Sequence, residues 1–216
     1  MGFASVCSSV EKEDYGVLGE ARQRKQDLIV YASRSGATRE IAERIAFILL
    51  RQGLEASVQP AQHADDPADY DVSLIGSATY YWHWMKPATK FLRRNRDVLA
   101  NRPVWLFSSG SLGCKADGSQ VRDTRAVAEP KEIAEFRQTI KPRGHRVFLG
   151  TLEPNKLGFI HRLMLKLPAS RDKAPLPLGN FRDWNDVEDW AFCIARVLTP
   201  SANLAQLDSR YANCCS

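Results

Sequence analysis

The chain has 216 residues, 44% of them hydrophobic and 25% charged, a composition that fits one globular domain and is too short for two of typical size. It has 30 basic and 25 acidic residues, so its formal net charge is +5. This composition excludes a wholly disordered chain, and no apolar run approaches the roughly 18 residues that a membrane-spanning helix needs.

Cysteine usage and the N-terminal sequence together indicate the compartment. The N-terminus lacks a basic start followed by a long apolar stretch, so we expect no secretory signal. No CxxC pair or His/Cys cluster offers a zinc site, and three of the five cysteines lie near the termini, where they cannot cross-link a core. We therefore expect a cytoplasmic protein without a metal site and with reduced thiols at Cys7, Cys114, Cys193, Cys214 and Cys215.

Predicted strands and helices alternate from residue 27 onward. Residues 1–26 are polar and aperiodic, so we expect a flexible leader, then a domain over 27–199 and a flexible tail over 200–216. Alternation of this kind predicts an α/β fold, with a doubly wound five-stranded parallel sheet in the order 2-1-3-4-5 and helices on both faces. The expected strands are 28–32, 54–59, 71–76, 103–107 and 146–150, and the expected helices are 38–53, 85–95, 131–140 and 184–198.

The loop after the first strand has the residue types of a phosphate site. It reads Ser33-Arg34-Ser35-Gly36-Ala37-Thr38 and leads into a helix, whose N-terminus attracts anions. Its small residues let backbone N–H groups converge, and three hydroxyls can complete a shell around a phosphate. The sequence contains neither GxxxxGK(S/T) nor a GxGxxG after this strand, which argues against a Walker-type nucleoside triphosphatase and a dinucleotide fold. The alternative is an ordinary serine-rich turn that caps the helix.

Two further loops follow strands that should end at the same edge of the sheet. The second, Ser77-Ala78-Thr79-Tyr80-Tyr81-Trp82-His83-Trp84, has four aromatic residues among its last five, which suits stacking on a flat ligand; the alternative is a ring cluster that fixes the loop. We expect His83 to be structural, because no nucleophile or carboxylate partner is evident in the sequence. The third loop, Ser108-Ser109-Gly110-Ser111-Leu112-Gly113, offers hydroxyls and amides to the polar edge of a ring system.

The three loops together resemble the cofactor site of flavodoxins. The first loop matches the flavodoxin phosphate-loop pattern (S/T)-x-(S/T)-G-x-T at every constrained position. These positions are Ser33, Ser35, Gly36 and Thr38. The resemblance implies bound FMN, with the phosphate on 33–38 and the isoalloxazine ring between 79–82 and 109–113. The candidate cofactor-binding residues are then 33–38, 77–82 and 108–113. The nearer resemblance is to the menaquinone-dependent protoporphyrinogen dehydrogenase family, over 31–45, 75–92 and 148–198. The chain also resembles actinobacterial flavodoxin-domain proteins.

This resemblance implies a flavin-dependent oxidoreductase that passes electrons from a small-molecule substrate, with protoporphyrinogen IX as candidate, to a quinone acceptor. No catalytic residue is assigned. Where the dehydrogenase family tends to have an Arg-Tyr-Gly run, this chain has Tyr80-Tyr81-Trp82, which removes a charge and adds bulk where substrate and flavin would meet. The alternatives are a non-catalytic flavodoxin-type electron carrier, although such carriers are usually acidic, and a binding module for another flat cofactor such as a deazaflavin.

A basic segment lies between Arg137 and Lys173, where nine basic residues face only Glu153 and Asp172. Within it, the stretch from Leu157 to Leu167 has an amphipathic helical pattern. We expect it to contact an anionic membrane surface, where a quinone would be found; the alternative is that its apolar face covers the sheet. Aromatic and basic residues occupy different segments, so we expect no binding of nucleic acid.

Overall fold

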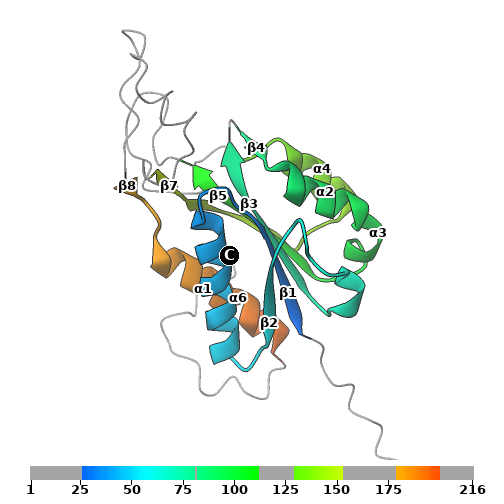
Figure 1. Ribbon diagram of the computed structural model, residues 1–216. Coiled ribbons are helices and arrows are strands. Elements are labelled where there is room, and N and C mark those ends of the chain that lie inside the picture. The colour runs from blue at the N-terminus through cyan, green and yellow to red at the C-terminus, as the bar shows by residue number, and fades with distance from the viewer. Residues whose placement is uncertain (1–25, 81, 112–128, 153–178, 200–216) are drawn as a thin grey trace, which may run out of the picture.

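The computed structural model describes residues 26–80, 82–111, 129–152 and 179–199. Its centre is a parallel sheet of five strands in the order β2-β1-β3-β5-β6 (Figure 1). A short strand, β4 (His83–Trp84), pairs antiparallel with the end of β3 and lies off this path. With β4 set aside, the order confirms the predicted doubly wound sheet. The five strands are β1 (Asp27–Ala32), β2 (Ala56–Pro60), β3 (Ser73–Tyr80), β5 (Val104–Ser111) and β6 (Gly144–Leu149).

Helices cover both faces of this sheet (Figure 1). One face is covered by α1 (Ala37–Arg51) and α6 (Trp184–Leu198), which contact each other. The other is covered by α2 (Lys86–Arg94), α3 (Arg96–Leu99) and α4 (Glu132–Thr139). A 3-10 turn, η1 (Pro67–Asp69), precedes β3, and the short strands β7 (Thr151–Leu152) and β8 (Gly179–Asn180) form a separate antiparallel pair. None of the helices in the described ranges is long and apolar enough to cross a bilayer.

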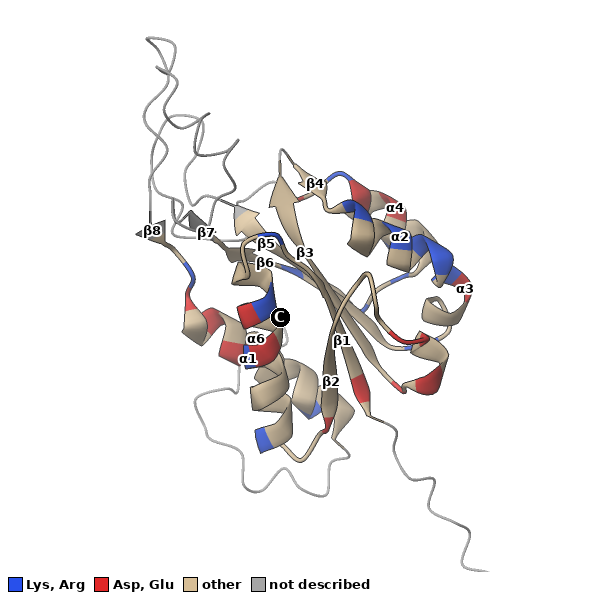
Figure 2. Cartoon of the chain, viewed as in Figure 1, with Lys and Arg blue, Asp and Glu red and all other residues tan. Residues whose placement is uncertain are grey.

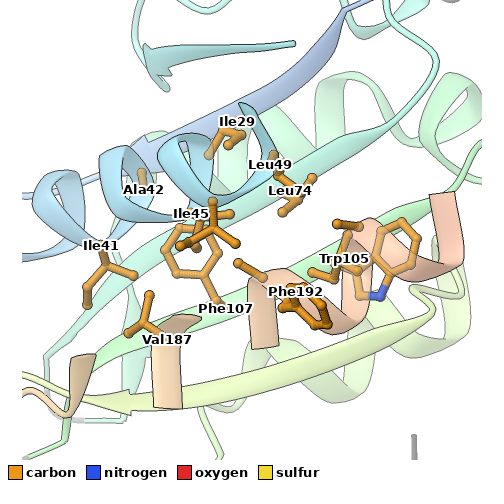
Figure 3. Close-up of a cluster of buried hydrophobic side chains, with 14 of the residues drawn as sticks. Ile29, Ile41, Ala42, Ile45, Leu49, Leu74, Trp105, Phe107, Val187 and Phe192 are labelled. Atoms are coloured by element: carbon orange, nitrogen blue, oxygen red, sulfur yellow. The ribbon is translucent and has the colours of Figure 1, made fainter. Parts of the chain in front are cut away.

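The core has two layers because successive strand residues point to opposite faces of the sheet. Ile29, Leu74 and Phe107 are buried against α1 and α6. Figure 3 shows side chains from α1 and α6 gathered around Phe107. Leu28, Ile75 and other strand residues are buried on the α2 side. Burial on both faces explains why the strands appear in the sequence as continuous apolar runs.

Gly76, in the middle of β3, lies against the side chain of Phe107 on the neighbouring strand. A Cβ at this position would lie 2.0 Å from Cζ of Phe107. The Phe107 ring is fully buried and contacts the tilted ring of Phe148 and the edge-on ring of Trp190, at centroid distances of 6.2 and 6.1 Å. Glycine therefore provides the space that this ring fills.

Two predicted strand ends are wrong, and both errors concern the site. The sequence analysis ended the third strand at Gly76 and the fourth at Phe107, whereas β3 continues to Tyr80 and β5 to Ser111. The residues beyond the apolar runs are small and polar, which is typical of loops. Here they stay in the sheet, since Ser77 pairs with Ser108 and Ala78 with Ser109.

Candidate functional site

Three segments leave the carboxyl edge of the sheet side by side. Ala32 of β1 is in register with Ser77 of β3, and Ser77 is in register with Ser108 of β5. The first loop follows Ala32, the β3–β4 hairpin extends β3, and the end of β5 lies on the other side of β3. The order changes direction between β1 and β3, and ligands of doubly wound sheets bind beside such a switch point.

The first loop (residues 33–38) is built around a left-handed glycine. Gly36 has φ +90° and precedes α1, and its N–H donates to Oγ of Ser33 at 3.0 Å. No side chain among the described residues caps the N-terminus of α1. Thr38, in the first turn, is only 1% exposed, and its Oγ1 has no hydrogen-bond partner in the described part of the chain. A buried hydroxyl and uncapped N–H groups at a helix N-terminus suit an anionic oxygen ligand.

Arg34 and Tyr80 connect the first loop to the end of β3. The Arg34 guanidinium lies over the Tyr80 ring, 5.2 Å from its centroid. Burial raises the pKa of the Tyr80 phenol, while the Arg34 charge and a hydrogen bond with Ser35 act in the opposite direction. Tyr80, which was predicted to lie in the second loop, therefore packs against the first loop.

The predicted second loop is a β-hairpin, and its aromatic side chains separate. Thr79 and Tyr80 of β3 pair with Trp84 and His83 of β4. Trp84 belongs to the core and contacts Phe136, so it is not available for stacking on a ligand, and at this position the alternative of a ring that fixes the loop applies. Trp82 is 52% exposed at the turn with φ +67°, and Tyr81 lies outside the described residues. Among the described residues of the predicted second loop, Tyr80 and Trp82 therefore remain as candidate stacking rings.

A chain of hydrogen bonds, buried from Trp84 to His145, holds this hairpin to β5 and β6. The indole Nε1–H of Trp84 donates to Oγ of Ser108 at 2.8 Å, and Ser108 is in turn 2.8 Å from Nε2 of His145. His145 Nδ1 lies 3.0 Å from Glu129, which also accepts both terminal nitrogens of Arg137 at 2.6 and 2.7 Å. Burial opposes ionisation of Glu129, but hydrogen bonds from Arg137 and His145 outweigh it and lower its pKa. The ionised carboxylate assigns the proton to Nδ1, so Nε2 accepts from the Ser108 hydroxyl.

The order Ser108–His145–Glu129 has the connectivity of a nucleophilic triad, but its position excludes that role. Ser108 is fully buried, and its oxygen already accepts from the Trp84 indole. The side chain of His145 is 1% exposed, and burial lowers its pKa. No substrate can reach the hydroxyl, so the network positions the hairpin. The sequence analysis missed it, because its members are far apart in the chain and form no motif.

Two further hydrogen bonds, both to Glu132, join the hairpin to α4. His83 Nδ1 is 2.8 Å from Oε1 of Glu132, and the other carboxylate oxygen accepts the Trp84 backbone N–H at 3.1 Å. Burial would raise the pKa of Glu132, but its hydrogen bonds with His83 and the Trp84 N–H lower it overall. The expectation that His83 lacks a carboxylate partner is therefore wrong, since Glu132 lies 49 residues away in sequence. The interaction agrees with a structural role for His83.

The third loop (residues 108–113) is mostly strand. Ser108 and Ser109 are buried in β5, and the pairing with β6 shifts register between Ser109 and Ser111. Gly110 lies at this irregularity with φ +114°, and a Cβ there would be 3.1 Å from the carbonyl oxygen of Thr79. Leu112 and Gly113 lie outside the described residues.

Arg182 braces the first turn of α1 and was not among the predicted site residues. Its side chain is 5% exposed, with a nitrogen 2.5 Å from Oε2 of Glu40 and the guanidinium 4.7 Å from the centroid of the Trp184 ring. Its Nε also donates to Asn180 at 2.9 Å. Glu40 is four residues beyond Gly36, so Arg182 balances the carboxylate nearest to the first loop on α1.

A doubly wound parallel sheet with a hydroxyl-rich loop before its first helix defines the flavodoxin-like class of α/β proteins. The sequence matches the family model for the flavodoxin domain over residues 28–176, and the chain belongs to this family.

Two kinds of similar protein were found. Protoporphyrinogen IX dehydrogenase [quinone] from Escherichia coli (strain K12) is 25% identical, over 79% of this chain and 94% of that protein. Rubredoxin oxygen:oxidoreductase from Desulfovibrio gigas is 15% identical with a TM-score of 0.50, over 82% of this chain and 37% of that chain. An archaeal flavodoxin is 17% identical with a TM-score of 0.48, over 80% of this chain and 98% of that chain. The structural match to the Desulfovibrio protein supports the fold alone.

Proposed function

We propose that this protein is an FMN-dependent oxidoreductase whose first loop holds the FMN phosphate. The observation that carries this proposal is the Thr38 hydroxyl, which is buried and without a hydrogen-bond partner in the described part of the chain. A buried hydroxyl without a partner costs stability, so a ligand oxygen at this point would satisfy it. FMN, when bound, supplies the electron-transfer chemistry; the protein's part is to bind and orient it.

The charges around the first loop favour a phosphate. The N-terminus of α1 contributes partial positive charge, and Arg34 adds a full charge within the loop. Glu40 would oppose an anion from the same helix turn, but it is paired with the buried Arg182. Residues 33–38 are thus the proposed phosphate site, with Ser33, Ser35 and Thr38 as hydroxyl donors.

For the isoalloxazine ring we propose the space flanked by the hairpin and the end of β5. Residues 77–82 and 108–113 are the proposed ring-binding segments, with Tyr80, Tyr81 and Trp82 as stacking candidates. The hydrogen bonds from Trp84 to Ser108 and to Glu132 give this hairpin a rigid base. A rigid base fixes the orientation of whatever the hairpin contacts.

The substrate proposal is protoporphyrinogen IX or a related reduced tetrapyrrole, with a quinone as acceptor. The protoporphyrinogen IX dehydrogenase [quinone] of E. coli, which is similar over 94% of its length, supports this proposal. The proposed membrane contact through residues 157–167 would bring the protein to a bilayer quinone, and that segment lies outside the described residues. Tyr80-Tyr81-Trp82 adds bulk next to the proposed ring site, so this hairpin is the place where substrate selection would differ from that of the relative.

Anaerobic substrate oxidation tests the proposal. Purified protein is loaded with FMN and mixed with protoporphyrinogen IX, and flavin bleaching near 450 nm is followed, with dithionite as the control reductant. We expect bleaching by the substrate and recovery of colour on addition of a water-soluble quinone. Bleaching by dithionite alone would instead favour an electron carrier, and failure to take up FMN would contradict both functions.

A further inference from the structure

Basic residues are concentrated on α2 and α3, away from the first loop (Figure 2). Three of them, Lys86, Lys90 and Arg94, are spaced four residues apart and so form one ridge along α2. At 1.5 Å per residue the ridge spans about 12 Å.

This ridge lines a groove of about 640 Å³ between α2 and the segment after β2. The remaining lining residues are Ala61, Gln62, Pro87 and Phe91, so part of the surface is apolar and no carboxylate faces the groove among the described residues. We name it the α2 groove. Its lining thus combines apolar surface with three cations.

The charge of the ridge is not balanced by the described part of the protein. Arg93 pairs with Glu135, and Arg96 pairs with Asp97. Lys86, Lys90 and Arg94, by contrast, form no ion pair with any described residue; the Arg94 guanidinium lies near the Phe91 ring, 5.8 Å from its centroid. Asp65 and Asp66 accept hydrogen bonds from neutral donors, namely Gln59, Tyr70 and the Ala68 N–H, and neither is paired with a cation of the ridge.

The Lys86 end of this ridge is unfavourable for the helix, whereas the helix dipole favours Arg94 in the last turn. Like charges four residues apart repel each other, and Lys86 lies in the first turn, where the helix dipole disfavours a cation. No acidic residue occupies that turn. A local arrangement that opposes stability in this way is typical of a functional surface.

The α2 groove adjoins the carboxyl edge of the sheet. On the side of the groove after β2, the backbone N–H of Ala61 donates to the carbonyl oxygen of Tyr31, two residues before the first loop. On the α2 side, the N–H of Met85 donates to Oγ of Ser77, and Lys86 follows immediately. A ligand in the groove would therefore lie next to the proposed flavin site, on the α2 face of the sheet.

We propose that the α2 groove binds the anionic end of the redox partner molecule, a ligand with two or more carboxylate or phosphate groups on an apolar body. This inference rests on the proposed function. The anionic groups contact Lys86, Lys90 and Arg94, and the apolar part covers Pro87 and Phe91. Two sources have this chemistry: a dicarboxylate tetrapyrrole and the phosphate-bearing half of a nicotinamide nucleotide.

Equilibrium binding with redox-inert probes tests the groove directly. Mesoporphyrin IX represents the dicarboxylate tetrapyrrole, and 2′,5′-ADP represents the nucleotide; each is titrated into the full-length protein with and without FMN. The groove variant is Lys86→Gln/Lys90→Gln. The matched control is Arg93→Gln/Arg96→Gln, which removes the same charge from the same segment but outside the groove.

We expect one of the two probes to bind, with affinity at least about tenfold weaker in the groove variant and less than about twofold weaker in the control. The effect should shrink at high salt, because exposed charges are screened. FMN affinity should be equal in all three proteins. Equal weakening in both variants, or no binding of either probe, would overturn the proposal. Groove-dependent binding in a protein that takes up no FMN would contradict the proposed function alone.

Discussion

The buried Ser108 hydroxyl gives a sharp test of how the hairpin is held. Ser108→Ala removes the acceptor of the Trp84 indole N–H and the donor to His145 Nε2, both at 2.8 Å. Each of the two buried groups left without a partner costs about 1–3 kcal/mol, and loss of the Ser108 hydroxyl removes its own burial cost of about 1–2 kcal/mol, so we expect a net loss of about 2–4 kcal/mol in the free energy of unfolding. That is a substantial part of the 5–15 kcal/mol typical of a domain.

Urea unfolding followed by tryptophan fluorescence and circular dichroism measures this loss. With a slope of about 2 kcal/mol per M, the midpoint should fall by about 1–2 M. Ser73→Ala is the matched control, because Ser73 is equally buried in β3 and its hydroxyl has no partner in the described part of the chain. Its removal should be neutral or slightly stabilising.

A double-mutant cycle separates the hydrogen bond from general packing. Trp84→Phe removes the indole N–H, so the double variant Trp84→Phe/Ser108→Ala should lose less stability than the sum of the single variants, by about 1 kcal/mol or more. If Ser108→Ala and Ser73→Ala unfold at the same urea concentration, the network does not hold the hairpin and the reasoning is refuted.

Three further predictions follow from other contacts. Gly76→Ala should cost about 1–3 kcal/mol in urea unfolding, because its Cβ would overlap the Phe107 ring; an unchanged midpoint contradicts this close approach. Arg182→Met should weaken FMN binding in a fluorescence titration about fivefold, since the Glu40 carboxylate loses its counter-charge, and Glu40→Gln should restore affinity; equal affinities would exclude this bracing role. Burial lowers the pKa of His145, so the unfolded state binds more protons below its ordinary pKa of 6.5. The free energy of unfolding should therefore fall as pH drops from about 6.5, by at most about 1.4 kcal/mol per pH unit, and His145→Asn should flatten this dependence.

The fold could be predicted because its signals are local. Strands buried on both faces appear as short apolar runs, such as Leu28 to Ala32, and α6 was predicted over its full range by the spacing of its apolar residues. The first loop was found for the same reason, since a strand, a hydroxyl-rich turn and a helix follow each other directly.

The hydrogen bonds and ion pairs that hold the site in place could not be predicted, because their partners are far apart in the sequence. Nothing near Trp84 indicates that its indole N–H meets Ser108, so it was grouped with the rings of a ligand-binding loop. Serines after an apolar run indicated a loop, but pairing with neighbouring strands keeps Ser108 and Ser109 in β5. Arg182 and Glu40 are 142 residues apart, and only the family resemblance over 148–198 included the Arg182 region.

FMN binding to the first loop is the central claim, and one titration tests it most directly. Flavin fluorescence is followed as wild-type protein, Thr38→Val and the control Thr139→Val are added to FMN; Thr139 is exposed on α4, and its hydroxyl bonds only within that helix. Loss of a hydrogen bond to a charged phosphate costs about 1.5–3 kcal/mol, so Thr38→Val should bind FMN roughly 10- to 150-fold more weakly, with Thr139→Val unchanged. Equal FMN affinity in all three proteins, or no quenching by the wild type, would contradict the claim.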